Sequence, residues 1–271
     1  RAALLSKIEK PSAVEQFDAI LKVSDGIMVA RGDLGVELPV QNVPPIQKRL
    51  VRKCRAAAKP VIVATQMLES MIESPMPTRA EVSDVATAIY EGSDAIMLSA
   101  ESAAGGYPIE AVTTMNNVAM EVESDPTYTE IIEASRKAVR TTVADGIVAA
   151  AREIAETADV KAICCFSQSG TTALLVARER PRVPIIALTS YRSTARRLCL
   201  TWGTNCVVTG PVDRFKTAVI AAVRASLKQG LATEKDMIVV TAGVPFNTPG
   251  STNILRVAPC AEKLIYAADP E

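Results

Sequence analysis

The chain contains 271 residues, of which 48% are hydrophobic and 22% charged, a composition typical of a globular protein with one large domain or two of ordinary size. Lys and Arg (30) balance Asp and Glu (30) and aromatic residues make up only 4%, so neither charge steering nor base stacking points to nucleic acid as a partner. No apolar run approaches the ~20 residues of a spanning helix, so we expect no membrane partner either.

The first half of the chain alternates short apolar runs with amphipathic stretches. The apolar runs carry little charge and are rich in branched residues, which predicts buried strands at 3–9, 26–31, 61–66 and 95–100. Helical patterns between and after these runs begin at Pro11, Pro44, Arg79 and Pro108. Alternation of this kind predicts parallel strands joined by crossover helices.

The stretch from Glu121 to Asp145 is polar and has no strand pattern, and Asp125-Pro126 within it is a turn signal. We therefore predict a boundary that gives domains 1–125 and 126–271, with two or three helical segments after it. The second half then repeats the alternation and predicts an open, mostly parallel α/β sheet with strands at 162–167, 184–189, 205–210, 237–242 and 253–258.

The histidine and cysteine content limits the kinds of metal site and the thiol chemistry that the chain can have. Histidine is absent, which removes the commonest general base and zinc ligand, so any metal site must use oxygen ligands. No Cys-x-x-Cys pair occurs and most cysteines lie in apolar stretches, which favours buried, reduced thiols in a cytoplasmic protein. The cysteines are Cys54, Cys164, Cys165, Cys199, Cys206 and Cys260.

Polar residues follow each strand predicted in the first half. Lys7 and Glu9 share one face because they lie two apart on a strand. The other groups are Arg31-Gly32-Asp33, Thr65-Gln66 and Ser99-Ala100-Glu101. Each group alone has an ordinary explanation: a surface ion pair, a turn or a satisfied core hydroxyl. Together they predict an active site, because barrels of alternating strands and helices build their sites at that edge.

The residue types favour one kind of chemistry. Glu9 and Asp33 supply hard oxygen ligands suited to Mg²⁺ or Mn²⁺. Lys7 supplies a positive charge for a developing oxyanion or a moving phosphoryl group. Gly32 permits close backbone approach to an anion, and Thr65 adds a hydroxyl donor. We therefore expect an anionic small molecule held through a divalent cation.

Long blocks of the sequence resemble pyruvate kinase. They include SKIEK, SDGIMVARGDLGVELP, VVTAGVPFNTPGSTN and the run from KPVIVATQMLES to AESAAGGYPIEAV, and they are densest between Lys7 and Val112. The resemblance implies the second half of a (β/α)8 TIM barrel, the catalytic domain, followed by a regulatory α/β domain. It also implies transfer of a phosphoryl group from phosphoenolpyruvate to ADP, giving pyruvate and ATP in the last step of glycolysis.

The resemblance assigns roles to individual residues. Lys7 corresponds to the lysine that stabilises the transferring phosphoryl group and the enolate. Glu9 and Asp33 correspond to the carboxylates that bind the divalent cation. The backbone amides of Gly32 and Asp33 and the Thr65 hydroxyl correspond to the cradle for the substrate carboxylate. Lys7 and Thr65 are therefore expected to be catalytic as well as substrate-binding.

Two further residues receive roles in the same way. Ser99 corresponds to a serine in the proton-relay region that completes protonation of the enolate, and it joins the catalytic group. Arg31 corresponds to an arginine beside the site, which we place with the substrate-binding residues and expect to give structural support. The stretch SAES at 99–102 differs from the common family pattern at its second and fourth positions, but both changes keep small size and the hydroxyl.

A second site is expected at Ser167–Thr172, between a predicted strand and a helical pattern at 173–180. Hydroxyls and free amides at a helix N-terminus form an anion pocket, although a capping loop needs the same residues. By resemblance this is the allosteric site for a sugar phosphate or nucleotide, together with a loop at 241–252. The expected effector-binding residues are Ser167, Ser169, Gly170, Thr171 and Thr172.

The resemblance begins in the middle of the family's barrel. Four strands are expected where a closed barrel has eight, and the first four strands, the lid domain and the K⁺ ligands have no counterpart. We therefore expect an incomplete chain with little kinase activity alone. The resemblance further implies a cytoplasmic homotetramer that uses Mg²⁺ (or Mn²⁺) and K⁺.

Two other functions remain open. Metal-dependent aldolases and lyases acting on pyruvate enolates also place Glu and Asp at barrel strand ends around Mg²⁺, but they need no nucleotide. Alternatively, the chain is an effector-binding and assembly module whose active-site residues are stranded in a partial barrel. ADP-dependent pyruvate formation tests the first alternative, and binding of effector without substrate would favour the second.

Overall fold

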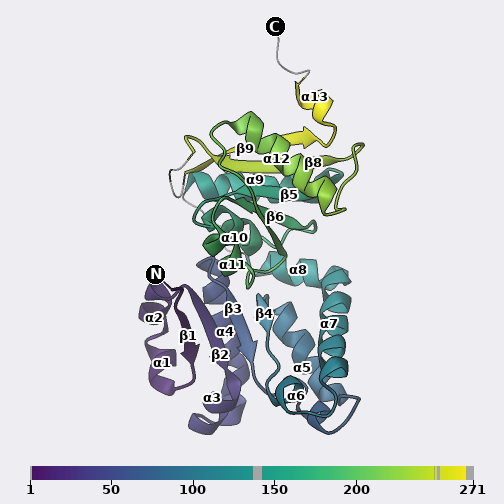
Figure 1. The fold of residues 1–271 in the computed structure, drawn as a ribbon. Helices are drawn as coiled ribbons and strands as arrows, with labels where there is room; N and C mark the ends of the chain where they lie inside the picture. Colours follow the sequence, from purple (N-terminus) through teal and green to yellow (C-terminus); the bar gives the residue numbers. More distant parts are fainter. Residues whose placement is uncertain (1, 137–141, 247, 249–250, 267–271) are drawn as a thin grey trace. The chain divides into compact units, whose positions relative to one another are not determined.

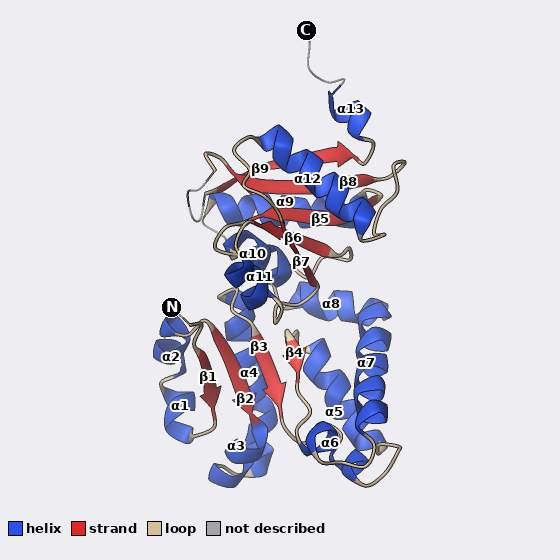
Figure 2. Cartoon of the chain, in the orientation of Figure 1, coloured by secondary structure: helices blue, strands red, loops and turns tan. Residues whose placement is uncertain are grey.

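The computed structural model describes residues 2–136, 142–246, 248 and 251–266 (Figure 1). The chain divides into two compact units, Arg1–Arg136 and Lys137–Glu271, and each unit has its own sheet (Figure 2). Every apolar run that the sequence predicts as a strand overlaps a strand of the structure. Among the described residues, no helix combines the length and apolar character that crossing a membrane requires.

The first unit is built on a parallel sheet in the order β1-β2-β3-β4, with β1 and β4 at its two open edges. The strands are β1 (Leu5–Ile8), β2 (Gly26–Ala30), β3 (Val61–Ala64) and β4 (Ala95–Ile96). The helices that follow them are α1 (Pro11–Glu15), α2 (Phe17–Val23), α3 (Arg31–Glu37), α4 (Val43–Ala56), α5 (Arg79–Tyr90), α6 (Ala100–Ala103) and α7 (Pro108–Ser124), with 3-10 turns η1 (Val40–Asn42) and η2 (Glu69–Ile72).

Amphipathic helices cover this sheet as their periodicity predicts. The residues Ile46, Leu50 and Cys54 recur every four positions along α4, and all three are buried in the core of the unit. Burying a side chain of this size stabilises the fold by roughly 1.5–3 kcal/mol. The helix predicted to begin at Pro11 is in fact two helices, because the helical conformation is interrupted at Gln16, between α1 and α2. The break leaves the apolar spacing unchanged, so periodicity alone could not reveal it.

Two aspartates at the start of strands fix the register at the end of the sheet opposite the predicted site. The Asp25 carboxylate, before β2, accepts the backbone N–H of Leu4 at 2.8 Å beside β1. The Asp94 carboxylate, before β4, accepts the N–H of Val61 at 3.0 Å on β3. Each side chain thus pairs a backbone N–H at or just before the start of a strand.

The division between the units falls after helix α8 (Pro126–Ala134), whereas the turn signal at Asp125-Pro126 predicts it before that helix. Asp125-Pro126 does not separate two domains here. The Asp125 side chain accepts the N–H of Thr127 at 2.7 Å and caps α8, which follows α7 directly. Tyr128 and Ile132 of α8 are then buried in the core of the first unit.

The second unit has a five-stranded sheet in the order β7-β6-β5-β8-β9, in which only β9 is antiparallel. Its strands are β5 (Val160–Phe166), β6 (Ile185–Thr189), β7 (Thr204–Val208), β8 (Met237–Gly243) and β9 (Thr252–Pro259). Its helices are α9 (Val143–Thr157), α10 (Thr171–Arg178), α11 (Arg192–Leu198), α12 (Phe215–Lys228) and α13 (Glu262–Tyr266). Strand order reverses between β5 and β8, which creates the switch point where open α/β sheets bind ligands.

Two apolar layers cover the faces of this second sheet. Cys164 of β5 packs in the layer that contains α12, and Cys165 packs in the layer that contains α9 and α10, because neighbouring strand residues point to opposite faces. Burial raises the pKa of both thiols to about 12. All six cysteines are free, but Cys199 is exposed and Cys206 is half-buried, so the expectation of buried thiols is wrong at Cys199.

Candidate functional site

The predicted cluster at the strand ends of the first unit forms around Lys7. Its ammonium Nζ lies 2.7 Å from Glu9 Oε2 and 2.9 Å from Asp33 Oδ2. Lys7 and Glu9 flank the fully buried Ile8, so strand alternation turns both polar side chains away from the core. Asp33 reaches the cluster from the first turn of α3, which follows β2, the strand next to β1 in the sheet.

Mutual attraction dominates the electrostatics of this cluster. Hydrogen bonds to Glu9 and Asp33 raise the pKa of Lys7 to about 12, so the ammonium keeps its charge at any physiological pH. The hydrogen bond from Lys7 lowers the pKa of Asp33. All three side chains are more than one-third exposed, which leaves their charges open to solvent and to a ligand.

Helix α3 begins directly at Arg31, where the residue pattern predicts only a strand end and a turn. Its N-cap residue Ala30 has no side-chain oxygen, so the first N–H groups of the helix, including those of Gly32 and Asp33, receive no side-chain cap. A helix start of this kind favours an anion. The signal for the helix was available in Asp33, an acidic first-turn residue, and in the fully buried Leu34 beside it.

Gly32 and Thr65 lie in contact. A Cβ atom added to Gly32 would approach the Thr65 hydroxyl oxygen to 2.8 Å, closer than real Cβ contacts come. Glycine at position 32 therefore allows the hydroxyl at the end of β3 to lie against the start of α3. The structure thus brings together two parts of the predicted site: Lys7 with Glu9 and Asp33, and Gly32 with Thr65.

Arg31 turns its guanidinium toward protein acceptors. Its side chain is only 11% exposed, and Nη2 donates to the backbone carbonyl of Thr65 at 2.7 Å while Nη1 donates to Asp84 Oδ1 at 2.7 Å. These contacts fit the support role expected for this residue. Its placement among the substrate-binding residues stays a prediction.

Ser99 occupies the corresponding position after β4, at the start of α6, but it contacts other groups. Its N–H donates to Glu101 Oε2 at 2.7 Å, and Glu101 Oε1 accepts the N–H of Leu68 at 3.2 Å. Among the described residues, no hydrogen bond or ion pair joins Ser99 to Lys7. Glu101 is 2% exposed and ties the segments after β3 and β4 together, a role that sequence reasoning missed although it noted Glu101 at the strand end.

Glu9 and Asp33 can supply two of the oxygen ligands that a divalent cation needs. In the described part of the chain, no group of three or more His, Cys, Asp or Glu side chains is arranged to hold a metal. Glu9 and Asp33 nevertheless face the same ammonium group and so can direct two hard oxygens to one place. Two carboxylates completed by substrate oxygens and water are the arrangement that Mg²⁺ accepts.

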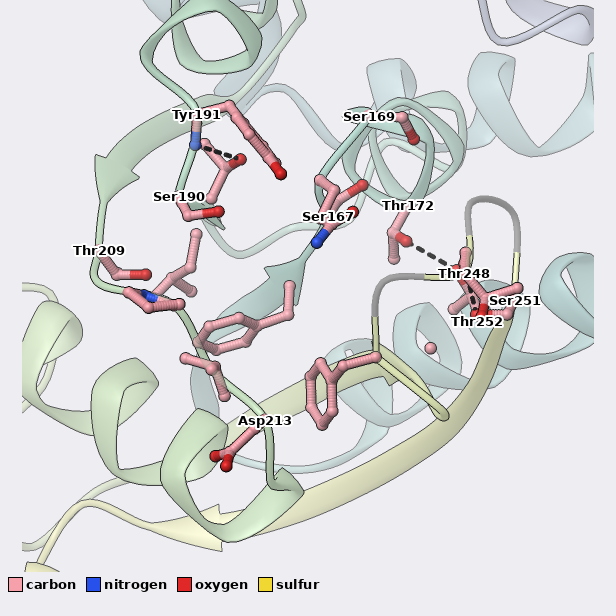
Figure 3. Close-up of a pocket in the computed structure, with 18 of the residues that line it drawn as sticks. Ser167, Ser169, Thr172, Ser190, Tyr191, Thr209, Asp213, Thr248, Ser251 and Thr252 are labelled. Carbon is pink, nitrogen blue, oxygen red and sulfur yellow. Dashed lines mark hydrogen bonds between the residues drawn. The ribbon is translucent and has the colours of Figure 1, made fainter.

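A cavity of about 640 Å³ lies in the second unit, where β5, β6, β7 and β8 end (Figure 3). Of the predicted effector residues, Ser167, Ser169 and Thr172 line it, whereas Gly170 and Thr171 are not among its described lining residues. Gly170 has φ of +92° at the N-cap of α10, a conformation that favours glycine, and its N–H donates to Ser167 Oγ at 3.0 Å. Gly170 therefore shapes the loop.

The second predicted loop also reaches this cavity. Thr248, Ser251 and Thr252 line it, and the Thr252 and Thr172 hydroxyls are 2.7 Å apart, both buried. Residues 247, 249 and 250 of the predicted 241–252 loop lie outside the described residues.

Sequence reasoning missed a further set of lining residues, which includes Ser190, Tyr191, Thr209 and Asp213 (Figure 3). They follow β6 and β7, so the strand-end argument used for the first half would have found them in the second.

Comparison with known proteins agrees with this two-unit α/β architecture. The family profile described as the pyruvate kinase barrel domain matches residues 1–112, and the profile of the pyruvate kinase alpha/beta domain matches residues 145–258. A pyruvate kinase of Methylorubrum extorquens is 51% identical over 258 residues, covering 95% of this chain and 54% of that protein. A pyruvate kinase of Clostridium acetobutylicum is 45% identical over 254 residues, 94% of this chain and 54% of that protein.

Solved structures give the same answer. The crystal structure of a pyruvate kinase from Cryptosporidium parvum superimposes with a TM-score of 0.86 at 37% identity, covering 95% of this chain and 51% of that one. The chain belongs to the pyruvate kinase family. It spans about half the length of the curated relatives quoted above. The predicted fold class is confirmed as part of a barrel, present as an open sheet, followed by an α/β domain.

Proposed function

We propose that this chain carries part of the active site of a pyruvate kinase, which transfers the phosphoryl group of phosphoenolpyruvate to ADP and yields pyruvate and ATP. One observation carries the proposal. The Lys7 ammonium lies between the carboxylates of Glu9 and Asp33 at the strand ends of the barrel part. Family membership supports the same activity.

Each group has a distinct task in this reaction. Lys7 places a fixed positive charge beside the phosphoryl group as its bond to the enol oxygen breaks and charge develops on that oxygen. The N–H groups of Gly32 and Asp33 and the Thr65 hydroxyl bind the substrate carboxylate. The enolate then takes a proton at carbon, and Ser99 belongs to the region from which that proton arrives. Positioning and charge neutralisation account for most of this catalysis.

Members of this family generally depend on magnesium and potassium. We assign Mg²⁺, or Mn²⁺ in its place, to Glu9 and Asp33, whose carboxylates suit a hard cation. When bound, this ion would neutralise charge on the substrate oxygens it shares. A K⁺ requirement, a cytoplasmic location and a homotetramer complete the proposal.

The cavity in the second unit supports an allosteric role. Its size accommodates a small ligand, and the hydroxyls of Ser167, Ser169 and Thr172 suit the phosphate of a sugar phosphate or nucleotide. This cavity also favours the second candidate function, in which the chain is an effector-binding and assembly module without activity of its own.

The metal assignment is tested by titrating the 271-residue chain with Mn²⁺ and following the free ion by electron paramagnetic resonance. The double variant Glu9→Gln/Asp33→Asn should lose the site at which phosphoenolpyruvate strengthens Mn²⁺ binding. Asp18→Asn, which removes an exposed carboxylate from the ion pair with Lys53, is the matched control and should bind as wild type does. Unchanged binding by the double variant would exclude this metal site.

The reaction is tested by an assay for pyruvate and ATP. Pyruvate formation from phosphoenolpyruvate that depends on ADP supports the kinase and argues against an aldolase or lyase. We expect little turnover from this chain alone, so near-normal turnover would contradict that expectation. Calorimetry with AMP, ribose 5-phosphate and fructose 1,6-bisphosphate distinguishes the kinase from the effector-binding and assembly module. Effector binding without any response to phosphoenolpyruvate and Mg²⁺ would favour the module.

A further inference from the structure

Thr65 is held on two sides, and only one of them belongs to the proposed substrate site. Its hydroxyl lies against Gly32, and its backbone carbonyl accepts a hydrogen bond from Arg31 Nη2 at 2.7 Å. The same Nη2 lies 2.8 Å from the sulfur of Met67, which is fully buried. Arg31 Nη2 therefore contacts the segment after β3 at two residues, Thr65 and Met67.

Two side chains from neighbouring helices fix that guanidinium. Asp84 of α5 accepts from Arg31 Nη1 at 2.7 Å, and Gln47 of α4 offers its amide oxygen to the same Nη1 at 3.4 Å. Gln47 is 3% exposed, and its amide nitrogen donates to Glu91 Oε2 at 2.9 Å. Because Glu91 takes the donor end of the amide, the acceptor end must face Arg31.

We propose that Asp84 and Gln47 are positioning residues for the proposed reaction: they hold the Arg31 guanidinium, which holds Thr65 so that its hydroxyl lies against Gly32. Neither residue carries chemistry itself. The proposal rests on the proposed function for its consequence in substrate binding, whereas the mechanical link from Asp84 to Thr65 stands on the contacts alone.

The charges explain why this link differs from an ordinary surface ion pair. The Arg31 side chain is largely withdrawn from water, so its charge needs a compensating acceptor, and Asp84 is the carboxylate that accepts from it. Guanidinium donors form a rigid planar fork, so fixing Nη1 at Asp84 also fixes the direction of Nη2. Without Asp84, the fork can turn toward water and release the carbonyl of Thr65.

Methyl resonances test the link directly in the 271-residue chain. The chain is labelled with ¹³C at the methyl groups of methionine and threonine, and Asp84→Ala is compared with wild type. We expect the Met67 and Thr65 methyl resonances to shift, because both residues contact Arg31. Met71, also fully buried, and Met237 in the second unit should keep their positions. Asp18→Ala, which breaks the exposed ion pair between Asp18 of α2 and Lys53 of α4, should shift neither Met67 nor Thr65.

Two further variants keep the test decisive. Asp84→Asn retains the acceptor oxygen without its charge, so it should restore most of the wild-type positions. Gln47→Ala should shift the same two resonances by less, since its contact with Arg31 is longer. If Asp84→Ala does not fold, Gln47→Ala decides. Unchanged Met67 and Thr65 resonances in folded Asp84→Ala or, failing that variant, in Gln47→Ala overturn the proposal.

Binding supplies the functional readout. We expect Asp84→Ala to weaken the affinity for phosphoenolpyruvate about tenfold, the size of one lost charge-assisted hydrogen bond, while Mn²⁺ affinity stays within twofold of wild type. A general loss of structure would weaken both. If wild type shows no response to phosphoenolpyruvate, the proposed function fails, and the methyl shifts still decide the link. If wild type binds and Asp84→Ala binds equally well, the positioning role is wrong.

Discussion

The two units both place polar groups at the ends of their parallel strands, but the types of side chain found there differ. In both, side chains gather where parallel strands end. The first unit gathers one ammonium and two carboxylates that are open to solvent. The second gathers hydroxyls and aromatic rings, and Asp213 is the one charged side chain among the described residues that line its cavity. Position along a strand therefore indicates where a site lies, and residue type decides what it binds.

The largest effect should come from Ile132→Ala, which tests whether α8 belongs to the first unit. Ile132 is 1% exposed, and its loss should reduce the free energy of unfolding of that unit by about 2–5 kcal/mol. Trp202 is the single tryptophan and lies in the second unit, so its fluorescence reports that unit while circular dichroism reports both. The fluorescence transition should not move.

The neighbouring residue gives a matched control. Ile131 is 39% exposed on the same helix, so Ile131→Ala should cost much less than Ile132→Ala. A Trp202 transition that moved together with the dichroism transition would assign α8 to the second unit instead.

The next effect concerns the cavity of the second unit. Thr252→Val leaves the buried Thr172 hydroxyl without its 2.7 Å partner. This should lower the free energy of unfolding of the second unit, followed by Trp202 fluorescence, by about 1–3 kcal/mol. The double variant Thr172→Val/Thr252→Val removes both hydroxyls and should recover much of that loss. If the double variant is the less stable of the two, the hydroxyl pair does not act as a unit.

A smaller effect separates two glycines of α3. Gly35→Ala should stabilise the first unit by up to about 1 kcal/mol, because a Cβ there meets only Val43 at an ordinary 4.0 Å. Gly32→Ala should forfeit that gain, since its Cβ would press on the Thr65 hydroxyl at 2.8 Å. Urea denaturation of the pair measures the difference. Equal effects would show that Thr65 is free to move away.

The smallest effect is the pH dependence of the charged cluster. The pKa of Asp33 is below its ordinary value, so the stability it contributes is present above pH 3.8 and is lost as pH falls through the lowered pKa. The pKa of Lys7 is raised to about 12, so its contribution is complete below 10.5 and is lost as pH rises through 12. Lys7→Met should return the pKa of Asp33 toward 3.8 in an NMR titration, whereas Lys22→Met should not.

Sequence patterns predicted that Lys7, Glu9 and Asp33 lie together because the signals for this cluster are local. Lys7 and Glu9 are two apart on one strand, and Asp33 follows the adjacent strand, so parallel pairing alone brings them together. The same strand-end rule, applied to the second half, would also have predicted Ser190 and Thr209.

Other features depend on partners far away in the sequence. Asp84 meets Arg31 across 53 positions, and no short window contains both. An Asp-Pro pair such as Asp125-Pro126 is typical both of a turn and of the start of a helix. Only the buried contacts of Tyr128 and Ile132 show that α8 belongs to the first unit. Sequence patterns supply the local candidates in these cases, and tertiary packing decides between them.

The cap at Asp125 has a practical consequence for anyone preparing the two units as separate proteins. A second-unit fragment cut just before Pro126 would retain α8 while losing the core that buries Tyr128 and Ile132. In that fragment α8 would expose these apolar side chains to water, which promotes self-association. Dividing the chain after Arg136 instead keeps α8 in the first-unit fragment, together with the core that buries it. Both fragments should then self-associate less.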